Sequence, residues 1–363
     1  MIEGEDLEEK TTPENVIIKD VEGSEVTIKF EAKKWAVTAL ANEMFTLKKK
    51  FDYSLAGWAN SATHSRSYWA EGVNYETEYI DYITSSTNPL TYLSLSQIVS
   101  SNGGVGNALG AGVEYVPEHT IGDKAKNGDT FDGTLTSTSL VVVGKYVVEG
   151  QSADKYKASE DGDDYHFYLS LTGTEDNKDV YTIYSQTDMI KKLIERSGLT
   201  LSTSNTEKKE LVDSELSKYF EVVTNKTDNS VELKYTGEGI YYQKDENSWE
   251  AMTKGEVENA SAKAKMYNNG WAYFWGPIKH NTDEEGKVGY YGVVRNHSYQ
   301  ITINSFTGLG APMDENVGGG DPEEDDPTPD NPIIPDPEDI KDAYINATIN
   351  VLSWHNIQYG VNF

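Results

Sequence analysis

The last nineteen residues of the chain, Ile345–Phe363, alternate between apolar and polar side chains. A period of two is the pattern of a β-strand with one covered face. The alternation breaks at Ser353 and His355 and then resumes with the same parity, so the segment contains two strand-length parts. Fully extended, it would span roughly 63 Å, whereas a typical strand has about five or six residues. We therefore expect part of it to be inserted elsewhere. Its apolar positions are Ile345, Ala347, Ile349, Val351, Ile357, Tyr359, Val361 and Phe363.

Composition excludes several classes of partner. The 363 residues are enough for two domains, and the net charge of −29 argues against binding to nucleic acid or an anionic membrane. The chain has no Cys, and no stretch approaches the roughly 20 apolar residues of a membrane-spanning helix. No signal peptide follows Met1, so we expect a mature or truncated start, and the many Tyr, Thr, Asn and Ser residues favour an extracellular protein.

Short apolar runs separated by polar turns predict a mainly β protein. Residues Val16–Ala32 predict a hairpin whose turn residue is Gly23, and the β-branched run Ser139–Gly150 predicts a buried strand. One helix is expected from an N-cap at Thr187 to a stop at Gly198, and a second short helix at residues 211–219. This mixture fits two β-rich domains with one or two short helices.

The expected organisation has five parts. The acidic, Pro-rich linker is too charged and too poor in apolar residues to fold, so we expect it to act as an extended tether. The parts are a mobile acidic start at 1–15, an N-terminal β domain at 16–138 that lacks its first strands, a C-terminal β-sandwich domain at 139–310, the linker at 311–342, and a C-terminal strand segment for assembly at 343–363.

Catalytic and metal-binding patterns are missing from the sequence. The six His residues show no metal-ligand spacing, no GxSxG motif occurs, and the glycines of Gly104–Gly110 lack the strand and helix that a dinucleotide loop needs. We therefore expect no catalytic residue, no metal and no cofactor. Two groups of aromatic residues include Trp58, Trp69, Trp271 and Trp275. Core packing is the favoured role for these groups, with a subunit interface or a glycan-binding surface as alternatives.

Several blocks resemble the fimbrillins of the Bacteroidetes, the major subunits of type V fimbriae. The strongest pair is YYGVVRNHSYQITINSFTGLGAP at Tyr290–Pro312 and, after the acidic linker, AYINATINVLSW at Ala343–Trp354. Similar blocks occur at Lys33–Lys49, Phe51–Tyr75 and Glu114–Ile121, in the order that the family shows.

The resemblance implies two transthyretin-like β-sandwich domains, an extended C-terminal donor segment and no enzymatic activity. It implies export as an outer-membrane lipoprotein and assembly on the cell surface, where the C-terminal strand of one subunit enters a neighbouring subunit. The implied partners are other copies of the chain and other fimbrial subunits, in support of adhesion and biofilm formation. The sequence departs from the family pattern, because it has no lipobox Cys and its first Arg is Arg66. A tip adhesin that binds a host or bacterial surface protein or glycan through the aromatic groups is the alternative.

Overall fold

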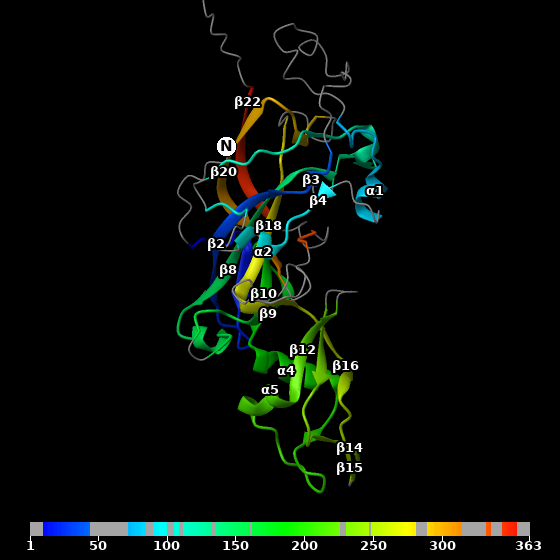
Figure 1. Ribbon diagram of the computed structural model, residues 1–363. Helices are drawn as coiled ribbons and strands as arrows, with labels where there is room; N and C mark the ends of the chain where they lie inside the picture. Colours follow the sequence, from blue (N-terminus) through cyan, green and yellow to red (C-terminus); the bar gives the residue numbers. More distant parts are fainter. Residues whose placement is uncertain are drawn as a thin grey trace, which may run out of the picture. The chain divides into compact units, whose positions relative to one another are not determined.

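The computed structural model describes residues 10–43, 72–84, 90–99, 105–108, 112–128, 130–131, 136–159, 162–225, 230–246, 248–280, 289–313, 332–334 and 343–353. These residues form a mainly β protein with several antiparallel sheets and few short helices, as the sequence predicts (Figure 1). The chain divides into two compact units, and each is assembled from segments that are far apart in the sequence. Unit 1 comprises Met1–Glu14, Glu31–Gly144 and Tyr273–Phe363, and unit 2 comprises Asn15–Phe30 and Lys145–Ala272.

Among the described residues of unit 1, two sheets face each other. The ring of Phe274 contacts the ring of Phe306 with 4.7 Å between centroids, which brings one sheet against the other. The first sheet has the strand order β2 (Thr27–Thr38), β8 (Ser139–Glu149), β18 (Trp271–Pro277) and β21 (Ala311–Pro312), and its first three strands also contain residues of unit 2. The second sheet pairs β20 (His297–Thr307) with β22 (Tyr344–Ser353).

Short elements complete the described part of unit 1. The three small strand pairs are β3 (Leu40–Ala41) with β4 (Leu90–Thr91), β5 (His119–Thr120) with β19 (Gly292–Val293), and β6 (Lys126–Asn127) with β7 (Thr130–Phe131). The helices are α1 (Tyr79–Thr84), α2 (Leu95–Val99) and the 3-10 turn η2 (Asp123–Ala125).

Two stretches of the range expected as a linker, 311–342, are packed within unit 1. Strand β21 joins the first sheet, and Ile333 is fully buried, with its N–H donating to the carbonyl of Leu93 at 2.8 Å. The prediction of a tether throughout this range is therefore wrong at these positions. Ile333 can be buried although the sequence around it is acidic, because packing one apolar side chain against the protein requires only a few residues to be ordered.

The described residues of unit 2 form three sheets. The first has the order β1 (Val16–Lys19), β10 (Lys178–Tyr184), β9 (Phe167–Glu175) and β17 (Lys265–Tyr267). The second has the order β12 (Phe220–Asn225), β13 (Ser230–Tyr235) and β16 (Gly255–Lys263), and the third has β11 (Leu201–Ser202), β14 (Tyr241–Asp245) and β15 (Ser248–Ala251). The short helical elements are η3 (Ala153–Tyr156), η4 (Asp213–Glu215), α5 (Leu216–Tyr219) and η5 (Asn268–Gly270).

The main helix of unit 2, α4 (Gln186–Ser197), buries Met189, Ile190 and Leu193 in a core shared with β12, β13 and β16. The predicted stop is confirmed, because Gly198 adopts the left-handed conformation with φ of 68°. The predicted N-cap is wrong by two residues. Ser185, not Thr187, accepts a hydrogen bond from the backbone N–H of Asp188, and the Asp188 carboxylate accepts the N–H of Ser185 in return.

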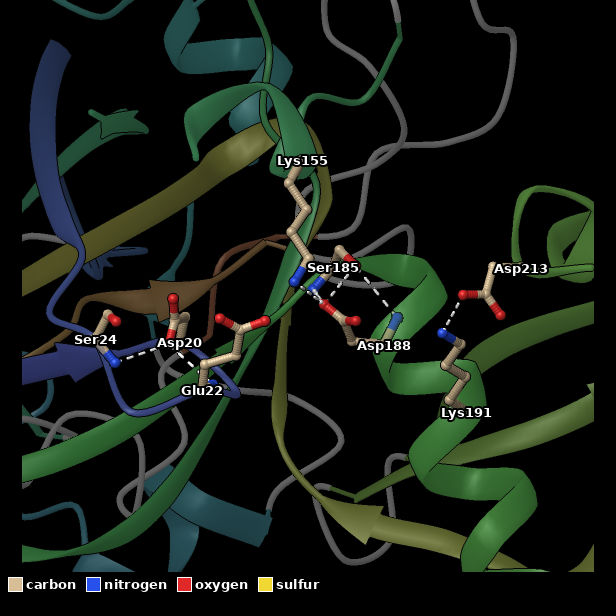
Figure 2. Close-up of polar contacts among 8 residues, drawn as sticks. All are labelled: Asp20, Glu22, Ser24, Lys155, Ser185, Asp188, Lys191 and Asp213. Atoms are coloured by element: carbon tan, nitrogen blue, oxygen red, sulfur yellow. Dashed lines mark hydrogen bonds and ion pairs between the residues drawn. The ribbon is translucent and has the colours of Figure 1, made fainter. Parts of the chain in front are cut away.

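Figure 2 shows the polar contacts around the start of α4. Burial tends to raise the pKa of Asp188, but hydrogen bonds from Lys155 and Ser185 outweigh it and hold that pKa below its ordinary value. In the nearby turn, Asp20 accepts the backbone N–H groups of Glu22 and Ser24 at 2.9 and 2.8 Å. These contacts satisfy backbone N–H groups at the start of α4 and in the turn after Asp20. They therefore stabilise local structure and do not indicate a catalytic site.

Candidate assembly surface

Strands β20 and β22 form a long antiparallel ladder in unit 1, and they lie side by side in Figure 1. The pairing runs from His297 opposite Ser353 to Thr307 opposite Tyr344, with an irregularity at Asn304. Side-chain hydrogen bonds fix this register on the polar face. The amide of Asn304 donates to the hydroxyl of Thr348 at 3.2 Å, and the amide of Asn346 donates to the hydroxyl of Thr307 at 2.8 Å.

On the inner face of this ladder, the apolar side chains of β22 are more exposed than those of β20. Ile301 and Ile303 of β20 are 1% and 3% exposed. Their direct partners Ile349 and Ala347 on β22 are only half-buried. Directly paired residues share one face of a sheet, so the apolar surface continues onto β22 while the protein that covers it does not. The inner face therefore ends in a partly uncovered row at β22.

We call the side of β22 that faces away from β20 the outer edge. Within the described residues, no strand pairs with this edge, since every pairing of β22 is with β20. The strand is ten residues long and contains no charged residue, no Pro and no Gly. Natural proteins usually protect an exposed edge with charges, Pro or a short strand, because an open edge can pair with another chain. The outer edge lacks these protections.

A cavity of about 370 Å³ lies beneath the apolar side chains of β22. It is lined by Ile345, Ala347 and Ile349, by the end of β18, and by Tyr290 and Tyr291. Ile345 packs over Gly276, where an added Cβ would make an ordinary van der Waals contact at 3.5 Å from the Cδ1 atom of Ile345. Most of the lining is aliphatic or aromatic, and Lys279 adds one cationic side chain.

A second cavity of about 420 Å³ lies along the other part of β20. One wall is the extended segment Val113–Glu118, in which Tyr115 is 86% exposed, and the other wall includes Arg295 and His297. The Glu118 carboxylate is buried and accepts hydrogen bonds from the backbone N–H and the Nε of Arg295, at 3.2 and 2.6 Å. This ion pair holds the segment against the start of β20.

Hydrogen bonds also order Val294 and Tyr299, which line the second cavity. The Tyr299 hydroxyl accepts the backbone N–H of Val294 at 2.8 Å and lies 2.8 Å from Nδ1 of His280. Burial raises the pKa of the Tyr299 hydroxyl, so it stays protonated. The rings of His280 and His297 meet edge to face with 5.1 Å between centroids. These contacts are structural, because they tie the segment that follows β18 to β20.

The structure places some of the predicted site residues and not others. Ile345, Ala347, Ile349 and Val351 lie on the apolar face of β22. The remaining predicted donor residues, Ile357, Tyr359, Val361 and Phe363, lie outside the described residues, as do Trp58 and Trp69. Sequence reasoning missed the Glu118 and Arg295 pair, although Glu118 lies within a block that carried the family resemblance.

Trp271 and Trp275 are buried, with 6% and 2% of their surface exposed. The Lys145 ammonium lies over the Trp271 ring at 4.9 Å, and the ring of Tyr92 stacks on Trp275 with 6.1 Å between centroids. Sugar rings bind to exposed aromatic faces, and neither indole offers one. The structure therefore corrects the use of these two residues as a glycan-binding surface.

The described residues contain no group of three or more His, Cys, Asp or Glu side chains arranged to hold a metal ion. Among the described helices, none has the length and apolar character needed to cross a membrane.

Residues 265–360 match the family model described as major fimbrial subunit protein type IV, fimbrillin, C-terminal. This part of the chain is a fimbrillin domain. Fimbrillins are subunits of cell-surface fimbriae and are structural proteins, not enzymes. The fimbrillin domain contains β17, β18, β20 and β22, so the outer edge and much of the lining of both cavities belong to it. No curated protein matched the chain.

Proposed function

We propose that this fimbrial subunit polymerises by inserting its C-terminal segment into a neighbouring subunit. The observation that carries the proposal is the division of that segment at Ser353. The part before this residue, β22, is already paired with β20 of its own chain. The part after it repeats the same apolar alternation in the sequence, and we assign it to the neighbour.

The physical basis of such a joint is β-augmentation. An added strand gains main-chain hydrogen bonds along an open edge, and its alternate side chains fill successive apolar sites. Ile357, Tyr359, Val361 and Phe363 provide four such side chains. At about 1.5 to 3 kcal/mol for each buried side chain, the gross gain is about 6 to 12 kcal/mol before ordering costs. A joint of this strength is long-lived, which suits a polymer.

The deciding test removes residues 354–363 and leaves β22 intact. We expect the truncated subunit to fold and to form neither filaments in electron microscopy nor heat-resistant ladders on SDS gels. A matched pair of full-length variants shows whether assembly depends on the apolar side chains of the segment or only on its length. Replacing Ile357, Tyr359 and Val361 by Asn should abolish the ladders, and replacing Asn356, Gln358 and Asn362 by Ser should preserve them. Filaments from the truncated subunit at the wild-type yield would refute the proposal.

The cell-surface location follows from the fimbrillin family. Export as a lipoprotein and a role in adhesion stay predictions. Two sandwich domains of the transthyretin type also stay a prediction, since the described sheets show a mainly β fold and no more.

A further inference from the structure

We propose that the hairpin formed by β14 and β15 carries a binding site for an uncharged oligosaccharide, built around Trp249 and Tyr241. Both strands belong to unit 2 and lie outside the fimbrillin domain at residues 265–360. The inference therefore goes beyond the proposed function, because it adds ligand binding to a subunit whose assembly we assign to another part of the chain.

Trp249 differs from the other Trp residues that the structure describes. Trp35, Trp271 and Trp275 are all buried. Trp249 is only half-buried, in a strand whose other three residues are exposed. Its indole N–H makes no hydrogen bond within the described part of the chain. A large aromatic side chain that stays partly in water, with its polar group unused, is more typical of a binding surface than of a core.

The pleat of the hairpin turns Trp249 away from the core of unit 2. Tyr242 of β14 and Met252, which follows β15, pack against that core. Successive side chains of a strand point to opposite faces, so Tyr241 and Ala251 point the other way. Trp249 lies two positions before Ala251 and shares its face. Two aromatic side chains therefore lie on the side of the hairpin that faces away from the core.

We call Tyr241, Gln243, Trp249 and Ala251 the aromatic face. Strands β14 and β15 pair so that Tyr241 lies opposite Ala251 and Gln243 lies opposite Trp249 (Figure 1). Tyr241 and Trp249 are thus diagonal neighbours on one face, about 7 to 8 Å apart, which is within reach of aromatic side chains. Two rings at this separation can stack on two units of one oligosaccharide.

Polar groups surround the two rings. The amide of Gln243 donates to the carbonyl of Glu246 at 3.2 Å, which leaves its own carbonyl oxygen to accept from a ligand. On the other side, Ser202 of β11 pairs with Tyr241, and its hydroxyl donates to the carbonyl of Glu207 at 2.8 Å. Directly paired residues share one face of a sheet, so the segment that follows β11 lies over this end of the aromatic face. It bounds the face with a polar wall beside Tyr241.

The chemistry of the aromatic face selects a neutral sugar. Trp and Tyr rings stack on the C–H faces of sugar rings, while amide and hydroxyl groups bind sugar hydroxyls. No residue of the aromatic face is charged, and the net charge of −29 on the chain repels an anionic polysaccharide. A subunit of a cell-surface fimbrium is also placed where it meets such glycans.

An array of neutral and anionic oligosaccharides, probed with the full-length subunit, tests the site. We expect neutral oligosaccharides to bind, and isothermal titration calorimetry then measures the affinity. Trp249→Ala and Tyr241→Ala should each weaken binding at least roughly tenfold, because each removes one stacked ring. Trp249→Phe should weaken binding less than Trp249→Ala does, because it keeps an aromatic ring.

Tyr115→Ala is the matched control. It removes an aromatic side chain that is 86% exposed in unit 1, and it should leave the affinity for the oligosaccharide unchanged. Each variant must first show the wild-type circular dichroism spectrum. Should Trp249→Ala fail to fold, Gln243→Ala keeps the test open, because Gln243 is exposed and its loss should still weaken binding.

Several results would overturn the inference. One is the absence of binding to any neutral oligosaccharide on the array, or binding to anionic ones only. Another is an equal affinity for the wild type and for Trp249→Ala. Loss of filaments in Trp249→Ala would mean that a second copy covers the aromatic face, and it would also overturn the inference. Normal filaments that have lost the oligosaccharide are the supporting result, and the truncation at Ser353 tests the proposed function separately.

Discussion

His119 shows how burial controls the charge of a single side chain. Its Nδ1 accepts the backbone N–H of Thr138 at 3.2 Å, so that nitrogen carries no proton. Burial lowers the pKa of His119 from 6.5 to about 4. The neutral ring therefore fits the folded state, whereas the unfolded chain binds a proton near pH 6.5.

This difference predicts a pH dependence of stability. The free energy of unfolding should fall as the pH drops from about 6.5 to about 4, by up to on the order of 3 kcal/mol, because only the unfolded state gains a proton in that range. Below pH 4 the slope from this group ends. Chemical denaturation at several pH values measures it, and His119→Asn, whose side-chain oxygen can accept the same N–H, should flatten the curve. The burial-lowered pKa of His166 contributes in the same direction, so the comparison must be made between wild type and variant.

Equal pH slopes for the wild type and for His119→Asn would contradict the role given to His119. Such a result would mean that the imidazolium form is tolerated at this position. The variant must first show the wild-type circular dichroism spectrum at pH 7.

At the scale of elements, the helix α4 and strand β22 mark what can be predicted from the sequence and what cannot. The apolar spacing of α4 and its Gly198 stop are local signals, and both were predicted correctly. The N-cap was not predicted correctly, because Ser185 and Thr187 are both good capping residues and only the backbone direction decides between them. The alternation in β22 predicted a strand. Its partner β20 is separated from it in the sequence by the acidic linker, so no local pattern could identify the pairing.

The cap can be tested with a matched pair of substitutions. Ser185→Ala should lower the free energy of unfolding by about 1 kcal/mol, because the N–H of Asp188 loses its acceptor. Thr187→Ala should change it by no more than about 0.5 kcal/mol, because Thr187 lies inside the helix, where Ala is well tolerated. Urea denaturation followed by circular dichroism measures both. A larger loss for Thr187→Ala than for Ser185→Ala would show that the helix begins later than described.

At the scale of the whole molecule, charge opposes the association that a fimbrial subunit needs. The chain carries a net charge of −29, so copies repel each other at low ionic strength. Screening shortens the range of this repulsion from about 30 Å at 0.01 M salt to about 8 Å at 0.15 M salt. The described ion pairs do not change this balance, because each joins charges within one chain.

We therefore expect filament growth to accelerate when NaCl is raised from about 0.01 M to about 0.15 M, as measured by light scattering at constant subunit concentration. KCl at the same ionic strength should give the same rate, because screening does not depend on which monovalent cation is present. A rate that falls with salt would indicate that attraction between opposite charges, and not uncharged strand edges, drives the encounter of subunits.

The Glu118 and Arg295 pair also constrains when unit 1 can fold. The two residues are 177 positions apart in the sequence, and the intervening chain includes most of unit 2. Contacts of such long range are slow to form, since the chain entropy lost on closing the loop precedes the gain from the contact. During synthesis, Glu118 leaves the ribosome long before Arg295 exists, and β22 follows later still. The outer edge thus forms only after the residues of β22 have been synthesised, and a chain that stops short of them has no such edge.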